Sequence, residues 1–213
     1  MRIDILTLFP SMFDGVISTS IIKRAIESNK VSINIIDFRK YSKDLHHKVD
    51  DTPYGGGAGM VLSIQPIYDC INDIKTNDSY IILTSPRGKR YNQSKAIDLS
   101  QKKHIIIICG HYEGVDERVN ELCDDIISIG DFVLTGGEIP AMAITDSVVR
   151  LIDGVISKES LDSESFNGNL LDFPVYTKPY DFMGMKVPDV LISGDHKKID
   201  EYRKSQQLLV DNN

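Results

Sequence analysis

Three glycine-bearing segments hold most of the residues in this chain whose types and spacing could do chemistry. The most informative, Ser128-Ile-Gly-Asp-Phe-Val-Leu-Thr-Gly-Gly-Glu-Ile-Pro-Ala-Met142, combines glycines, a proline and two acids. The others are Leu83-Thr-Ser-Pro-Arg-Gly-Lys-Arg90 and Cys109-Gly-His-Tyr-Glu-Gly-Val-Asp-Glu-Arg118. Glycine permits close approaches that a side chain forbids, so these segments can wrap around a flat or extended ligand. We expect one shared pocket, in preference to three unrelated tight turns.

Arg150 and Glu164 are candidates for proton transfer. Arg150 lies roughly three helical turns beyond Pro140, and Glu164 stands in a polar segment together with Asp162. A carboxylate can remove a proton from a ring nitrogen while a guanidinium stabilises charge on a neighbouring carbonyl oxygen. From spacing alone, an exposed helix arginine and a solvated loop acid are the favoured interpretations.

A second glycine cluster, Gly55-Gly-Gly-Ala-Gly-Met60, follows Asp50 and Tyr54. It lacks the Gly-Lys-Ser/Thr ending of a phosphate-binding loop and the spacing of a dinucleotide fingerprint, so nucleoside triphosphate hydrolysis is not supported. Its backbone could instead close over a planar base, and a mobile surface loop is an equally weighted alternative. The residues assigned to substrate binding are Asp50, Tyr54, Gly55, Gly57, Gly59, Arg87, Lys89 and Arg90.

The sequence contains no pattern that indicates a metal centre. The five histidines show no metal-ligand spacing, and no motif indicates magnesium. His111 is interpreted either as a ligand contact or as a histidine hydrogen-bonded within its loop. The three cysteines lack a Cys-x-x-Cys pattern, so free buried thiols are expected. No Gly-x-Ser-x-Gly elbow supports acyl transfer.

The formal net charge of -7 argues against nucleic-acid binding through bulk electrostatics. Local clusters of lysine and arginine at 39–48 and 87–103 could contact a polyanion, although charge alone favours solvated faces. No apolar run reaches the ~20 residues of a membrane helix, and no signal peptide is expected. We therefore expect a cytoplasmic protein without a membrane partner.

Short apolar runs alternate with helical patterns, which predicts an α/β fold with a parallel sheet. Strands are expected at 2–9, 31–37, 80–83, 104–109 and 125–129. Helices are expected around 21–26, 64–74, 91–99, 116–122, 139–151 and 194–207. The carboxyl ends of parallel strands are where ligands bind in open sheets, so the pocket is placed there. The polar stretch 156–169 predicts a flexible linker between a first domain, 1–155, and a small region, 170–213.

The glycine-bearing segments, together with Asp146-Ser-Val-Val-Arg150, Leu170-Leu-Asp-Phe-Pro-Val-Tyr-Thr-Lys-Pro179 and Pro188-Asp-Val-Leu-Ile-Ser-Gly-Asp-His196, closely resemble bacterial tRNA (guanine-N1)-methyltransferases. This family (TrmD) belongs to the SPOUT superfamily, and the resemblance spans nearly the whole chain. It implies a deep trefoil knot, an obligate homodimer and bent S-adenosylmethionine. The residues that it places around this methyl donor are Thr84, Ser85, Pro86, Gly110, Tyr112, Glu113, Gly114, Ile129, Gly130, Asp131, Phe132, Val133, Leu134, Gly136, Gly137 and Pro140.

The same resemblance implies methylation at N1 of the guanosine 3′ of the tRNA anticodon, at position 37, with a guanosine recognised at position 36. Arg150 matches the family's catalytic arginine, which stabilises guanine O6. The family's general base is an aspartate before Ser-Phe, whereas this chain has Glu164 there, with Asp162 in reserve. The family also continues further, so a shortened C-terminal tRNA-binding region is expected. The alternatives are a weakly active or non-catalytic tRNA-binding dimer and an enzyme acting on another RNA.

Overall fold

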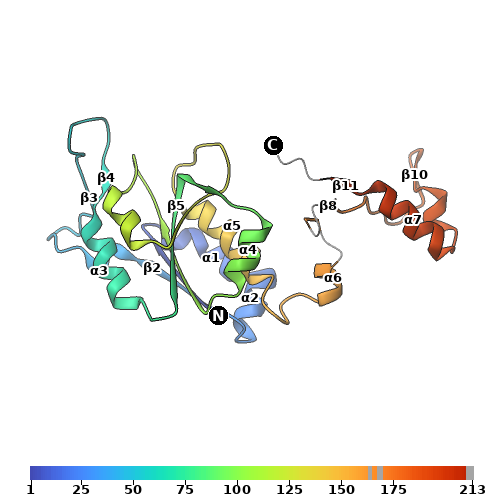
Figure 1. Cartoon of the computed structure of the whole chain (residues 1–213), viewed down its shortest axis with the longest axis horizontal. Coiled ribbons are helices and arrows are strands. Elements are labelled where there is room, and N and C mark those ends of the chain that lie inside the picture. The colour runs from blue at the N-terminus through green and yellow to red at the C-terminus, as the bar shows by residue number, and fades with distance from the viewer. Residues whose placement is uncertain (163–164, 167–169, 210–213) are drawn as a thin grey trace. The chain divides into compact units, whose positions relative to one another are not determined.

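The computed structural model describes residues 1–162, 165–166 and 170–209. It divides the chain into two compact units, Met1–Ile156 and Ser157–Asn213. Each unit has its own secondary structure (Figure 1). Among the helices of the described residues, none has the length and apolar character that crossing a bilayer requires.

A five-stranded parallel sheet forms the centre of the first unit, in the order β2-β1-β6-β5-β7. Its strands are β1 (Arg2–Thr7), β2 (Ser32–Asp37), β5 (Ser79–Arg90), β6 (His104–Cys109) and β7 (Asp125–Ser128). Every residue of β6 is buried, as expected for a central strand covered on both faces. The predicted α/β class with a parallel sheet is confirmed.

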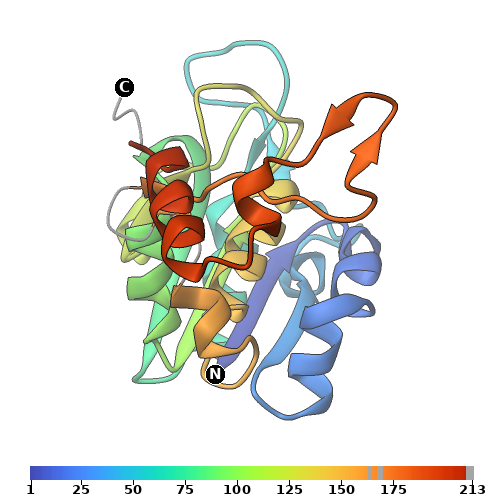
Figure 2. The same ribbon diagram turned by 90° about the vertical axis from the view of Figure 1, so that its right-hand side faces the viewer.

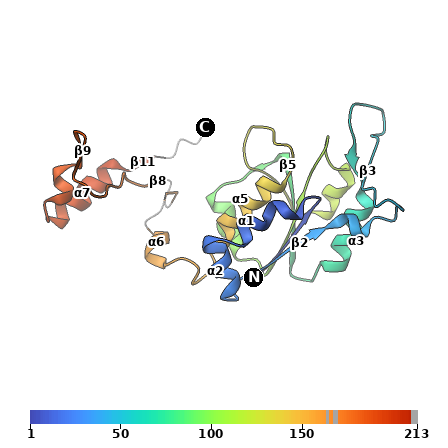
Figure 3. The ribbon, with the colours of Figure 1, turned by 180° about the vertical axis from the view of Figure 1, so that it is seen from behind.

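Helices cover both faces of this sheet. On one face, apolar side chains of the strands pack against helices α2 (Ser20–Glu27), α4 (Gln93–Ser100) and α5 (Glu138–Val149), beside α1 (Asp14–Ile17) and the 3-10 helix η1 (Pro10–Phe13). The other face is covered by α3 (Ile64–Ile74) and the 3-10 helices η2 (Phe38–Tyr41) and η3 (Glu117–Leu122). Figures 1 and 3 show α3 on the opposite side of the strands from α2 and α5. Successive residues of each strand therefore point to opposite faces of the sheet and pack into two separate hydrophobic cores.

Strand β5 is longer than the predicted 80–83, because it continues to Arg90. Its pairing with β7 shifts register, since Thr84 and Lys89 both lie opposite Ile127. The intervening residues form a bulge that leaves the ladder. A Cβ on Gly88 would lie 2.5 Å from the backbone of residues 126 and 127, so the bulge can rest on β7 only through a glycine. The predicted loop 83–90 is thus a bulge held at both ends, and the helix predicted at 116–122 is the 3-10 helix η3.

Cys70 and Cys109 are free and buried, as predicted, whereas Cys123 is only partly buried. Burial raises the pKa of the Cys70 thiol to about 12 and the pKa of the Cys109 thiol well above its usual value. A thiolate is the reactive form of cysteine. Both side chains therefore serve the core as small apolar groups.

The second unit contains short elements. They are α6 (Lys158–Asp162), β8 (Leu170–Leu171), β9 (Asp181–Phe182), β10 (Met185–Lys186), η4 (Asp189–Ile192), α7 (His196–Gln206) and β11 (Leu208–Leu209). Strands β9 and β10 form an antiparallel hairpin, and β11 pairs with β8. Figure 2 shows this hairpin and α7 most clearly. Helix α7 lies within the range 194–207, where a polar helix was predicted. Helix α6 lies within the range 156–169, which was predicted to be a linker.

A polar network centred on the buried residues Asp4 and His104 lies near the amino ends of β1 and β6. Asp4 is fully buried. Its carboxylate lies 2.6 Å from Arg2 Nη2 and 2.9 Å from His104 Nε2, and it accepts a hydrogen bond from Asn34 Nδ2 at 2.6 Å. The other ring nitrogen of His104 lies 2.7 Å from Ser79 Oγ. The network links β1, β2, β5 and β6 at the edge of the sheet where these strands begin.

The substitution Asp4→Ala is expected to lower the free energy of unfolding by about 1–3 kcal/mol, because it leaves the buried ring of His104 without its hydrogen-bond partner. Urea unfolding followed by circular dichroism measures this loss. The matched control is Asp98→Ala, because the Asp98 side chain is 50% exposed and pairs with Lys95 and Lys102 at the surface. This substitution should change stability by no more than about 1 kcal/mol. Equal urea midpoints for the two variants would contradict the role given to Asp4.

Candidate active site

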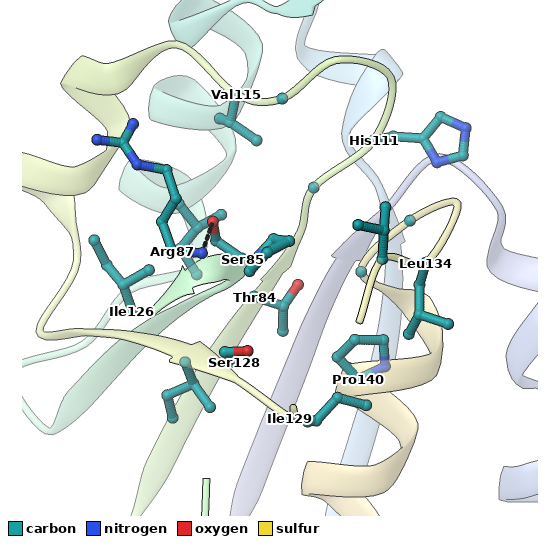
Figure 4. Close-up of a pocket in the computed structure, with 18 of the residues that line it drawn as sticks. Thr84, Ser85, Arg87, His111, Val115, Ile126, Ser128, Ile129, Leu134 and Pro140 are labelled. Carbon is teal, nitrogen blue, oxygen red and sulfur yellow. Dashed lines mark hydrogen bonds between the residues drawn. The ribbon is translucent and has the colours of Figure 1, made fainter. Parts of the chain in front are cut away.

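A cavity of about 550 Å³ lies at the carboxyl ends of β6 and β7 and beside the bulge of β5. All three glycine-bearing segments contribute to its wall, as Figure 4 shows for Thr84, His111 and Leu134. This is the edge at which ligands bind in open parallel sheets, and the volume is in the range of small-molecule sites.

The structure brings together nearly all the residues predicted to surround a methyl donor. The cavity is lined by Thr84, Ser85, Pro86, Gly110, Tyr112, Glu113, Gly114, Ile129, Gly130, Phe132, Val133, Leu134, Gly136, Gly137 and Pro140. Asp131 is not in the lining, and its carboxylate pairs with Arg90 instead.

Close backbone packing joins the loop before α5 to the end of β6. The amide of Gly137 donates a hydrogen bond of 2.7 Å to the carbonyl oxygen of Gly110, and Gly136 forms an isolated bridge with His111. A Cβ on Gly137 would lie 2.1 Å from Thr84 Oγ1 and 2.7 Å from the amide nitrogen of Gly110. The two loops can therefore approach only through glycine, and together they leave a cavity with backbone walls.

Two residues of the cavity lining, Arg87 and Glu117, form an ion pair with each other. Arg87 projects from the bulge of β5, and its Nη1 donates to Glu117 Oε2 on η3 at 3.0 Å. Asn120 Nδ2 donates to the other oxygen of Glu117 at 2.8 Å. The Arg87 and Glu117 side chains are 80% and 69% exposed, so the pair lies on the solvent side of the cavity. The backbone amide of Arg87 donates to Ser85 Oγ, as Figure 4 shows.

Glu117 and Asn120 line the cavity but were not assigned to it from the sequence. A spacing of three residues puts two side chains on the same side of a helical turn. Their position directly after the Gly-His-Tyr-Glu-Gly loop was the available signal. Without the fold, nothing in the sequence shows that η3 turns back to the mouth of the cavity.

Glu138 is a buried acid at the first turn of α5. Thr7 Oγ1 donates a hydrogen bond of 2.8 Å to Glu138 Oε1. Nδ1 of His111 lies 4.0 Å from Glu138 Oε2 and has no hydrogen-bond partner among the described residues. The His111 ring instead packs against Phe9 and Tyr112, with centroid distances of 4.8 and 4.9 Å. His111 therefore lines the cavity, where it could contact a ligand. The alternative prediction, a histidine hydrogen-bonded within its loop, is not found among the described residues.

The glycine cluster joins the site through its backbone. Strands β3 (Asp50–Asp51) and β4 (Val61–Leu62) form a hairpin, and the Glu113 amide donates to the carbonyl oxygen of Met60 at 3.1 Å. The loop of this hairpin extends away from the sheet (Figure 1). Positive φ angles occur at Gly55, Gly56, Gly57 and Gly59, a backbone region that other residues rarely adopt. Tyr54 is fully exposed in this loop.

Arg150 and Glu164 are not brought to this cavity by the described part of the chain. Arg150 directly follows α5 and lies about 15 Å along the helix axis beyond Pro140, the residue of α5 that lines the cavity. Arg150 is absent from the lining. Glu164 lies outside the described residues, and Asp162 is the last residue of α6. In the described ranges, no group of three or more His, Cys, Asp or Glu side chains is arranged to hold a metal ion.

Comparisons with known proteins agree on one family. The family model described as "tRNA (Guanine-1)-methyltransferase TrmD" matches residues 1–212. A tRNA (guanine-N(1)-)-methyltransferase of Malacoplasma penetrans is 59% identical over 208 residues, which cover 98% of this chain and 92% of that protein. The protein of the same name from Carboxydothermus hydrogenoformans is 54% identical, covering 98% and 83%. That from Bacillus pumilus is 55% identical, covering 98% and 87%.

Proposed function

The chain belongs to the tRNA (guanine-1)-methyltransferase family, and we propose that it methylates N1 of the guanosine at position 37 of tRNA, with S-adenosylmethionine as the methyl donor. It is therefore an enzyme that modifies tRNA. The observation that carries the proposal is the cavity between the three glycine-bearing segments. Because the substrate is tRNA, we place its activity in the cytoplasm.

The cavity suits S-adenosylmethionine in size and chemistry. Its volume of about 550 Å³ is within the range of sites for such molecules. Its lining includes the apolar side chains of Ile129, Leu134 and Pro140, against which a purine ring can pack. It also includes Gly110 and Gly136, whose backbone groups can form hydrogen bonds with the purine. When bound, this donor supplies an activated sulfonium methyl group.

The proposed chemistry assigns one step to each catalytic residue. The Glu164 carboxylate accepts the proton from guanine N1, which makes N1 a better nucleophile. The Arg150 guanidinium stabilises the negative charge that develops on O6. The cavity would position the donor so that its S–CH3 bond breaks as the bond to N1 forms, with S-adenosylhomocysteine as the leaving group, and this orientation would supply much of the rate enhancement.

We propose a homodimer in which Arg150 of one protomer serves the cavity of the other. The support is that Arg150 is absent from the lining of the cavity in its own chain and lies at the end of α5 opposite to Pro140, which lines it. Met12 and Ile139 also border a smaller cavity of about 130 Å³ beside the main one, and their side chains are 44% and 48% exposed. The family's deep trefoil knot is also proposed, on family membership alone.

The tRNA is proposed to contact the glycine-cluster loop and the basic end of β5. Lys89 and Arg90 continue β5 beyond its bulge, while Asp50, Tyr54, Gly55, Gly57 and Gly59 belong to the β3–β4 hairpin and its loop. Arg87 differs from these residues because it lines the cavity. Residues 1–155 are proposed as the donor-binding domain and 170–213 as the tRNA-binding region, joined by 156–169.

A methylation assay tests this function. Purified protein is incubated with labelled S-adenosylmethionine and unmodified tRNA that has guanosines at positions 36 and 37, and the modified nucleotide is mapped. We expect one methyl group at N1 of position 37 and none when guanosine 37 is replaced. Tight tRNA binding without methyl transfer would instead support the non-catalytic alternative, and methylation elsewhere would support another RNA substrate.

The substitution Gly137→Ala is expected to weaken binding of S-adenosylmethionine by at least about tenfold, because its Cβ would strike backbone atoms of β6 and displace the loop. Isothermal titration calorimetry measures the dissociation constant. Gly15→Ala is the matched control, since a Cβ there meets nothing within 4 Å. Unchanged affinity in Gly137→Ala would show that the loop does not form the binding wall.

A further inference from the structure

The charged side chains in the cavity wall match the charges of S-adenosylmethionine. Among the described residues that line the cavity, those with a full charge are Arg87, Glu113 and Glu117. S-adenosylmethionine carries one anion, its carboxylate, and two cations, its ammonium and sulfonium. One cation and two acids are the complementary set.

The ion pair lies on the solvent side of the cavity, across from its deepest apolar residues. Ile129, Leu134 and Pro140 gather at one end of the close-up in Figure 4, and Arg87 lies at the other. The apolar end suits the adenosine part of the molecule. The amino-acid end, which carries the carboxylate and ammonium, then extends toward Arg87 and Glu117.

The two side chains are positioned before any ligand reaches them. Glu117 is held by Asn120 through one oxygen and by Arg87 through the other. Arg87 is projected by the bulge of β5, which Gly88 fixes against β7. A guanidinium can present two parallel N–H groups to a carboxylate. A zwitterion can therefore replace the internal ion pair by two new pairs without a change in net charge.

We propose that Arg87 binds the carboxylate and Glu117 the ammonium of the amino-acid end of S-adenosylmethionine. This inference rests on the proposed function and assigns to Arg87 the methyl donor in place of tRNA. It makes the pair a specificity element that distinguishes adenosyl compounds with an amino-acid end from those without one. The element needs no contact with the reacting methyl group.

Two thioethers test the proposal directly. S-adenosylhomocysteine and 5′-methylthioadenosine share the adenosine and an uncharged sulfur, but only the first has the amino-acid end. Calorimetry on the full-length protein is expected to show that Arg87→Gln weakens S-adenosylhomocysteine binding by about tenfold. Binding of 5′-methylthioadenosine should stay within about twofold of the wild-type value, which also shows that the variant is folded. Glu117→Gln should give the same selective loss.

Decarboxylated S-adenosylmethionine separates the two partners. Its affinity should not change in Arg87→Gln and should fall in Glu117→Gln, because it lacks the carboxylate assigned to Arg87 but keeps the ammonium assigned to Glu117. The matched control is Arg118→Gln, which removes an exposed arginine that pairs with Asp116 outside the cavity lining, and it should leave every affinity unchanged. Equal losses for both thioethers, or no loss for either, would overturn the proposal. A wild-type protein that binds neither S-adenosylmethionine nor S-adenosylhomocysteine would instead refute the proposed function itself.

Discussion

Glu164→Gln is expected to lower the rate constant for methyl transfer by roughly 10²–10⁴-fold, which is the usual worth of a general base. Glutamine keeps the size of the side chain but cannot accept the proton from guanine N1. Single-turnover kinetics with saturating tRNA and S-adenosylmethionine measure this rate constant without product release. The affinity for both substrates should stay near the wild-type value, because the loss belongs to the chemical step.

Two further variants make this assignment specific. Glu164→Asp restores the acid that the resembling family carries before Ser-Phe, and it should retain activity. Asp162→Asn removes the neighbouring acid, and it should cost far less than Glu164→Gln. The reverse ranking would transfer the role of base to Asp162. Full activity in both amide variants would remove a carboxylate of this segment from the mechanism.

The position of the cavity could be predicted from the sequence because it depends on local patterns. Isoleucine-rich runs such as Ile105–Ile108 mark buried parallel strands, and the glycine-bearing loops follow these strands. Since the carboxyl ends of parallel strands meet at one edge, the loops had to converge. The amphipathic pattern of 64–74 likewise gave the bounds of α3.

The remaining features depend on contacts between residues far apart in the chain. The bulge of β5 arises from its register with Ile127 on β7, and Gly88 alone gave no local sign of it. The position of Glu117 at the cavity depends on how η3 packs. Helical spacing placed Arg150 at the end of α5 but could not show that this end lies away from the cavity. Local periodicity thus predicts where a residue lies along a helix, whereas its place relative to the site depends on contacts that periodicity does not show.

Arg150→Ala is expected to lower the rate constant for methyl transfer by about 10²–10³-fold, because the charge that develops on guanine O6 loses its stabilising cation. Calorimetry should show unchanged affinity for S-adenosylmethionine, since Arg150 is absent from the lining of the cavity. Single-turnover measurement separates the two effects. A loss of donor affinity as large as the loss of rate would mean that the substitution disturbs α5 and the loop before it.

Mixing two impaired variants, assayed at a concentration of S-adenosylmethionine well below its wild-type dissociation constant, tests whether Arg150 acts across the proposed dimer. Arg150→Ala has an intact cavity, and Gly137→Ala has a damaged cavity but an intact Arg150. If each cavity is served by the partner's arginine, a mixed dimer contains one site with both parts, and random association gives half of the dimers this composition. Co-refolded equal mixtures should then recover about a quarter of wild-type activity. If Arg150 instead serves the cavity of its own chain, every site in the mixture carries one defect, and activity stays at the level of the single variants.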